Sequence, residues 1–278
     1  MRTGVPRFQD LAESVPPGTL SVPLSYSSNW RSTVRNILSS LCAMMLVAVS
    51  LPAQSVDSLI AKYVQASGGM ARIQALQTLR RTGKFTGGGG FEAVVVYENK
   101  RPNSVREEFS IQGMMGINAY DGKNGWKIEP WQGKRDPESL GEEEMHRILD
   151  DADFDGPLVN YQAKGNRVEF QGMQPIEGSD AYKLKVTRPS GDVSFFYLDT
   201  DYYVPIRIDM QWMIRGAPTE TEISLGDYKQ VAGVYLPFSY ESGPKGSSST
   251  GRSKITFDKI EANVPLDDQR FTRPGTHP

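Results

Sequence analysis

The sequence has a single cysteine, Cys42, and only two histidines, His146 and His277, among its 278 residues. Cys42 lies in an apolar stretch that we expect to be removed on export, so no disulfide is predicted for the mature chain. A hydrolytic triad, a zinc site or a histidine base would have to use His146, which stands among carboxylates on a predicted helix. A lone histidine in that setting is more often a surface charge partner. We therefore predict that the protein is not an enzyme, with no catalytic residue, no metal and no cofactor.

The sequence also lacks an excess of charge of either sign. Its formal net charge is −2 at pH 7, and the charged residues are scattered rather than gathered in blocks. This composition offers no basic surface for a nucleic-acid partner. With 38% hydrophobic residues, the chain can still bury one good core.

No apolar run is long enough to span a bilayer comfortably. The stretch 37–49 is apolar but short, it follows Arg31 and Arg35, and a small-residue cleavage site ends at Ala53. This arrangement is typical of a secretory signal peptide. We therefore expect residues 1–53 to be an N-terminal extension plus signal peptide, and residues 54–278 to be a single domain.

The stretch 137–158 is predicted to be the one helix in the middle of the chain. Ser139 and Glu142 have the spacing of a capping box, and a run of glutamates suits the positive end of a helix dipole. The apolar positions recur at three- and four-residue spacing and form one narrow stripe, consisting of Met145, Ile148, Leu149 and Ala152. A lone amphipathic helix among strands must place that stripe on the sheet. We expect Met145, Ile148 and Leu149 to form part of a lid over it.

Two helices are expected before the strands, one from Val56 to Tyr63 with Ser55 as its N-cap, and a short one over 70–76. The hydrophobic period then changes to two, and about ten short alternating strands follow. This pattern predicts an antiparallel meander or barrel rather than a βαβ fold. A sheet of that size curls, and its inner face either fills with side chains or keeps a pocket for an apolar ligand.

Alternating apolar residues in these strands are the candidates for the inner face. Those that we expect to line a cavity are Val95, Tyr97, Phe109, Ile111, Leu184, Val186, Phe195, Tyr197, Ile208, Met210 and Trp212. Aromatic residues of a sheet are usually plain core, and the sequence does not separate a filled core from a lipid cavity.

Asp151, Asp153 and Asp155, followed by Gly156, match the first half of a calcium-binding loop. The second half fails, because Gln162 stands in the place of the bidentate glutamate and a strand rather than a helix is predicted to follow. We interpret these aspartates as an acidic helix end and predict no metal site.

Several turns and strand patterns are familiar, namely AYDGKNGW at 119–126, AYKLKV at 181–186, YLD at 197–199, and DYK at 227–229 leading to GVYLPF at 233–238. From about residue 56 onward the chain resembles the outer membrane lipoprotein-sorting proteins, the LolA-like periplasmic carriers. The resemblance implies a mainly β (α+β) fold. That fold is a strongly curved antiparallel sheet, or incomplete β-barrel, with a few helices against its concave face.

The resemblance further implies a periplasmic carrier that binds lipid or lipoprotein acyl chains in an apolar cavity for transfer to the outer membrane. We also expect the protein to be a monomer. Its partners would be donor and acceptor envelope proteins and, transiently, the membrane, with no nucleic acid. An alternative is a non-enzymatic sensor or scaffold of the cell envelope that uses the same fold to bind a protein partner.

Overall fold

The computed structural model describes residues 55–214 and 217–275. The predicted signal peptide in residues 1–53, with Cys42, lies outside these residues, as does His277. From Ser55 onward the described chain forms one compact unit. No helix in these described ranges is long and apolar enough to cross a membrane.

Helix α2 (Val56–Ala66) begins where its capping residue predicts. The Ser55 hydroxyl accepts a hydrogen bond from the Ser58 N–H at 3.1 Å. The helix ends before Gly68 and Gly69, whose φ angles of 120° and 89° suit glycine. Helix α3 (Met70–Ala75) follows at once. The predicted positions of both N-terminal helices are thus confirmed.

The described residues contribute 13 strands to one sheet, in which every neighbouring pair is antiparallel. They are β1 (Thr78–Thr86), β2 (Glu92–Lys100), β3 (Ser104–Ile111), β4 (Met114–Tyr120), β5 (Gly125–Glu129), β6 (Lys134–Ser139), β7 (Arg167–Ile176), β8 (Ser179–Thr187), β9 (Val193–Asp199), β10 (Pro205–Ile214), β11 (Ala217–Val231), β12 (Val234–Pro244) and β13 (Ser253–Ala262). Short 3₁₀ turns occupy Gly88–Gly90, Pro130–Gln132, Ser249–Gly251 and Asp268–Arg270.

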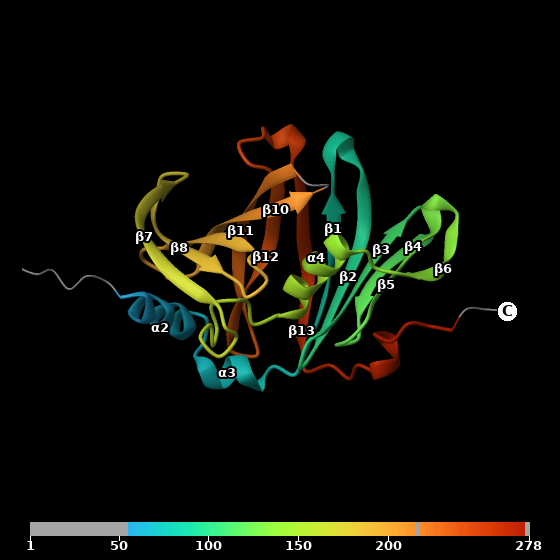
Figure 1. Ribbon diagram of the computed structural model, residues 1–278, viewed down its shortest axis with the longest axis horizontal. Coiled ribbons are helices and arrows are strands. Elements are labelled where there is room, and N and C mark those ends of the chain that lie inside the picture. Colours follow the sequence, from blue (N-terminus) through green and yellow to red (C-terminus); the bar gives the residue numbers. More distant parts are fainter. Residues whose placement is uncertain (1–54, 215–216, 276–278) are drawn as a thin grey trace, which may run out of the picture. The chain divides into compact units, whose positions relative to one another are not determined.

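The sheet consists of two meanders that meet at its centre. Its order is β6-β5-β4-β3-β2-β1-β13-β12-β11-β10-β9-β8-β7, so β1 pairs with β13 while β6 and β7 are the two edges. Because the edges do not pair with each other, the sheet stays open. Helix α4 (Glu142–Ala152) and the segment 153–166, which we call the strap, connect one edge to the other. Figure 1 shows α4 inside the curve of the sheet. The predicted mainly β, open and curved antiparallel fold is confirmed.

Helices cover the concave face in three places. Leu59 and Ile60 of α2 pack with Leu184 and Phe196, and Ile73 of α3 belongs to a second cluster, with β1, β2, β12 and β13. Under α4, a third cluster contains Val105, Tyr120, Ile148 and Ala152.

On the opposite face of β2–β5 lies the C-terminal segment. The Trp126 indole N–H donates to the Phe271 carbonyl at 2.7 Å, and Arg270 pairs with the buried Glu98 at 2.6 Å. The terminal residues therefore close the outer surface of this half.

The start of the central helix differs from expectation. Residues 134–139 form the edge strand β6, and α4 begins only at Glu142, with Gly141 as its N-cap. The Glu144 carboxylate, rather than that of Glu142, accepts the hydrogen bond of the Gly141 N–H at 2.9 Å. The predicted capping box between Ser139 and Glu142 is wrong, because Ser139 pairs with Trp126 of β5. Pairing with a distant strand outweighs the local capping signal there.

Candidate functional site

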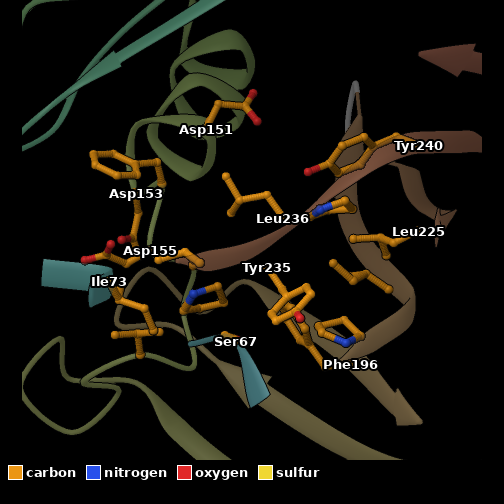
Figure 2. A pocket seen from close by; sticks show the side chains of 18 of the residues that line it. Ser67, Ile73, Asp151, Asp153, Asp155, Phe196, Leu225, Tyr235, Leu236 and Tyr240 are labelled. Carbon is orange, nitrogen blue, oxygen red and sulfur yellow. The ribbon is translucent and has the colours of Figure 1, made fainter. Parts of the chain in front are cut away.

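A cavity of about 330 Å³ lies on the concave face, between the sheet and the strap. Strands β10, β11 and β12 give it an apolar wall that contains Ile208, Met210, Ile223, Leu225 and Leu236. Figure 2 shows Leu225, Leu236 and Tyr240 on one side of the hollow and Asp151, Asp153 and Asp155 on the other. The cavity is therefore amphipathic.

The polar wall comes from the end of α4 and the strap, and most of its charges are paired. Asp155 forms a two-bonded ion pair with Arg101, at 2.6 and 2.7 Å. Asp153 accepts two hydrogen bonds from the Lys164 ammonium, at 2.5 and 2.8 Å. Two of the three carboxylates that resembled calcium ligands, Asp153 and Asp155, thus have a cation beside them. In the described ranges no group of three or more His, Cys, Asp or Glu side chains could hold a metal ion.

Asp150, at the same wall, lies 2.9 Å from Nε of Arg188. Burial nevertheless raises the pKa of Asp150 to about 6. The charge of Arg188 lowers this pKa, while the negative charges of Asp192 and Asp153 raise it. His146 is 3.1 Å from Asp192 and half-exposed, so it is a surface charge partner, as the sequence predicted.

A second acid of α4, Asp151, is placed against the buried Glu107 of β3. Burial raises the pKa of Asp151 well above its ordinary value, and the charge and hydrogen bonding of Glu107 raise that pKa further. Glu107 is only 1% exposed and has Arg147 of α4 at 3.4 Å. Asp151 therefore favours its protonated form more than an exposed aspartate does.

Arg81 of β1 also lines the cavity. Its guanidinium lies 5.4 Å from the ring centroids of both Tyr97 and Phe257, and Nη2 donates to Asn99 Oδ1 at 2.8 Å. The Nε atom is buried and has no hydrogen-bond partner within the part of the chain that the structure describes. The sequence pattern gave no reason to select this residue.

The residues predicted from the sequence are spread over the concave face. Ile208 and Met210 line the cavity itself. Val95, Tyr97 and Phe109 belong to the adjoining cluster under α3 and the strap, where the Tyr97 and Phe109 rings meet edge to face at 5.9 Å.

Other predicted residues lie away from the cavity. Leu184 and Val186 pack in the cluster under α2. Met145 and Ile148 pack beneath α4, and Ile111 is half-buried at the end of β3. The side chain of Trp212 is not among those that the structure describes.

Three expectations need correction. Leu149 is 44% exposed, so it does not join the stripe that α4 places on the sheet. Phe195 and Tyr197 lie on the opposite face of the sheet from the cavity, because their strand neighbour Phe196 is the residue that faces it. Successive side chains of a strand point to opposite faces, so the phase predicted for β9 was shifted by one residue.

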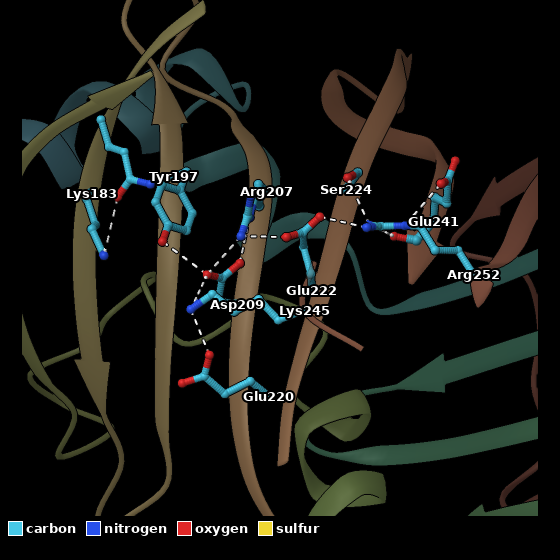
Figure 3. Close-up of polar contacts among 11 residues, drawn as sticks. Lys183, Tyr197, Arg207, Asp209, Glu220, Glu222, Ser224, Glu241, Lys245 and Arg252 are labelled. Carbon is cyan, nitrogen blue, oxygen red and sulfur yellow. Dashed lines mark hydrogen bonds and ion pairs between the residues drawn. The ribbon is translucent and has the colours of Figure 1, made fainter. Parts of the chain in front are cut away.

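The outer face around Tyr197 is covered by charge rather than by another layer. The Tyr197 hydroxyl donates to Asp209 at 3.1 Å, and Arg207 bridges Asp209 and Glu222 at 2.6 and 2.5 Å. Arg252 extends the chain of ion pairs at 2.7 Å from Glu222 (Figure 3). This network satisfies acids that are almost fully buried.

A second hollow, of about 1010 Å³, lies beside the cavity. It is mostly apolar and runs between α2 and the β9–β10 connection, where Tyr202 and Tyr203 stand. Three residues, Leu225, Tyr228 and Tyr235, line both hollows, so the two are neighbours. We call this second hollow the groove.

Comparison with known proteins places the fold. No family model matches the sequence. A DUF1329 family protein from Desulfovibrio piger is similar in structure, with a TM-score of 0.55 and 13% identity over 78% of this chain and 97% of that chain. A putative outer membrane lipoprotein-sorting protein domain from Vibrio parahaemolyticus has a TM-score of 0.52 at 12% identity, over 78% of this chain and 97% of that one. A LolA superfamily protein from Nitrosomonas europaea has a TM-score of 0.52 at 13% identity, with the same two coverages of 78% and 97%. The chain shares the fold of these structures.

Proposed function

We propose that the protein is a carrier that binds acyl chains of lipids or lipoproteins in the cavity and the groove of its concave face. The observation that carries this proposal is the apolar wall of β10–β12, which stays unfilled although the strap covers it. The fold shared with a LolA superfamily protein and a lipoprotein-sorting domain supports it. The expected signal peptide in residues 1–53 supports a periplasmic location, where exchange with the membrane and with donor and acceptor proteins would take place.

The size of the cavity suits part of an acyl chain. Its 330 Å³ lies at the small end of ligand pockets. Since benzene fills a cavity of about 150 Å³, this one holds roughly a dozen carbon atoms. Burial of about ten methylenes at ~0.8 kcal/mol each contributes about 8 kcal/mol, which corresponds to micromolar binding before other costs. A bilayer offers a similar gain, so release to a membrane is nearly balanced.

The groove supplies room for the remainder of a longer chain. Leu225, Tyr228 and Tyr235 line both the groove and the cavity, so a chain that passes from one to the other would run past these side chains. The Tyr228 hydroxyl donates to the Pro205 carbonyl at 2.6 Å, which holds this side chain in place. Tyr235 is the most exposed of the three, at 44%, so we expect a longer chain to displace this side chain first.

Native mass spectrometry of the exported protein, purified without detergent, tests the proposal. We expect lipid to be bound to the wild type, and to be lost from the double variant Ile208→Trp with Met210→Trp, which fills the cavity. Met173→Trp is the control, because Met173 is 58% exposed on the edge strand β7. If the double variant does not fold, Leu225→Trp is a second variant that fills the cavity and should also lose the lipid.

A wild type that is free of lipid and takes up no added fatty acid would refute the proposal. A stable protein partner whose binding is indifferent to lipid would instead favour the sensor or scaffold function.

A further inference from the structure

We infer that the ligand of the cavity is an amphiphile with an anionic headgroup, a carboxylate or a phosphate, which binds Arg81 while its chain lies along β10–β12. This inference rests on the proposed function and names the class of ligand. It favours acidic lipids and free fatty acids over neutral acyl glycerides, because only the former carry a charge for Arg81 to recognise.

The first support is the position of Arg81. It pairs with Tyr97 of β2 across the ladder, on the concave face, whereas the preceding Arg80 points to the outer face and pairs there with Glu98 at 2.8 Å. The guanidinium of Arg81 packs against two aromatic rings that also contact each other, and Asn99 accepts one of its hydrogen bonds. It is therefore oriented before any ligand binds.

The second support is a donor without an acceptor. Among the residues that the structure describes, no hydrogen-bond acceptor meets the buried Nε of Arg81. A buried donor that stays unpaired is costly, and more so on a charged group. A small turn of the guanidinium would let an anionic oxygen in the cavity supply the missing acceptor.

The third support is the pairing of the other charges on the polar wall. Asp150, Asp153 and Asp155 each have a cation of their own beside them. Arg81, which lines the same cavity, instead donates to the uncharged Asn99. An anionic headgroup would give Arg81 a partner of opposite charge.

The test is a competition against a fluorescent fatty acid bound to delipidated, full-length protein. The competitors share one chain and differ in headgroup: dodecanoate, dodecyl phosphate and dodecanol, all below their micellar concentrations. We expect the two anions to displace the probe at concentrations about tenfold or more below that of dodecanol, because a hydrogen bond to a charged group contributes that much to affinity. A difference between the two anions then tells which oxyanion the site prefers.

Arg81→Met should remove the preference, so that dodecanoate and dodecyl phosphate compete no better than dodecanol. Arg80→Met is the matched control, one residue away on the outer face, and should keep the preference. If Arg81→Met binds no competitor at all, Arg81→Lys decides the matter, because a preference kept by lysine supports the inference and its loss overturns it.

The failures of the two proposals are distinguishable. Equal competition by dodecanol and dodecanoate in the wild type, or a preference that survives in Arg81→Met, overturns the headgroup inference and leaves the carrier function in place. If neither the probe nor any competitor binds the wild type, both proposals fail.

Discussion

Replacement of Asp150 by asparagine should stabilise the protein at neutral pH, although Asp150 forms an ion pair. Burial raises the pKa of Asp150 to about 6, against the attraction of Arg188 at 2.9 Å and of His146. The neighbouring Asp192 and Asp153 raise that pKa further. The surroundings therefore favour the protonated carboxyl group, and asparagine resembles that form in shape and charge.

The size of the effect follows from the pKa. The difference between about 6 and the ordinary value of 3.8 corresponds to about 3 kcal/mol. The folded state binds this proton more tightly than the unfolded chain does, so the stabilising contribution is complete below about pH 4 and is lost as the pH rises through about 6. Asp150→Asn does not lose this stability as the pH rises, because asparagine does not titrate. The free energy of unfolding of Asp150→Asn, minus that of the wild type, should therefore increase by about 3 kcal/mol from about pH 4 to about pH 7.

Urea denaturation of both proteins at a series of pH values in this range measures the difference. Asp136→Asn, which alters an exposed carboxylate of β6, is the control and should leave the pH dependence unchanged. A stability difference between Asp150→Asn and wild type that is constant, or that falls as the pH rises, would refute the reasoning. It would mean that the attraction of Arg188 exceeds the cost of burial.

Two further predictions concern packing. Gly68→Ala should cost at least about 2 kcal/mol more than Gly69→Ala in urea denaturation. Both glycines have positive φ angles, but a Cβ on Gly68 would lie 2.2 Å from the Gly233 carbonyl oxygen, while one on Gly69 meets nothing within 4 Å. Equal losses would show that backbone strain alone matters. Ile148→Ala should cost about 3 kcal/mol, because this side chain is fully buried, whereas Leu149→Ala should cost less than about 1 kcal/mol. A larger loss at Leu149 would contradict the orientation of α4.

Local signals were sufficient for much of the fold. Ser55 marked the start of α2, and strict alternation of apolar residues located most strands. The signals failed where distant pairing decides. Ser139 has the chemistry of a helix cap and lies in a strand, because β5 offers it a partner.

Less of the site was predictable. Leu225 and Tyr228 both line the cavity although they stand three positions apart, which regular alternation would place on opposite faces. Asp227, between them, has a φ of 53°, and this left-handed residue resets the alternation. Arg81 and Asp151 come from a strand and a helix far apart in sequence, so only the folded sheet brings them to one cavity.

The pairing of β1 with β13 at the centre of the sheet has a consequence for folding. Within each meander the ladders join hairpin neighbours, which close short loops at little entropic cost. The central ladder instead joins Leu79 to Ala262, from opposite ends of the described fold, and carries the largest closure cost. The cavity takes Leu79 and Arg81 from one meander and the β10–β12 wall from the other. A chain in which this ladder has not yet formed therefore has no ligand compartment, and binding reports complete assembly.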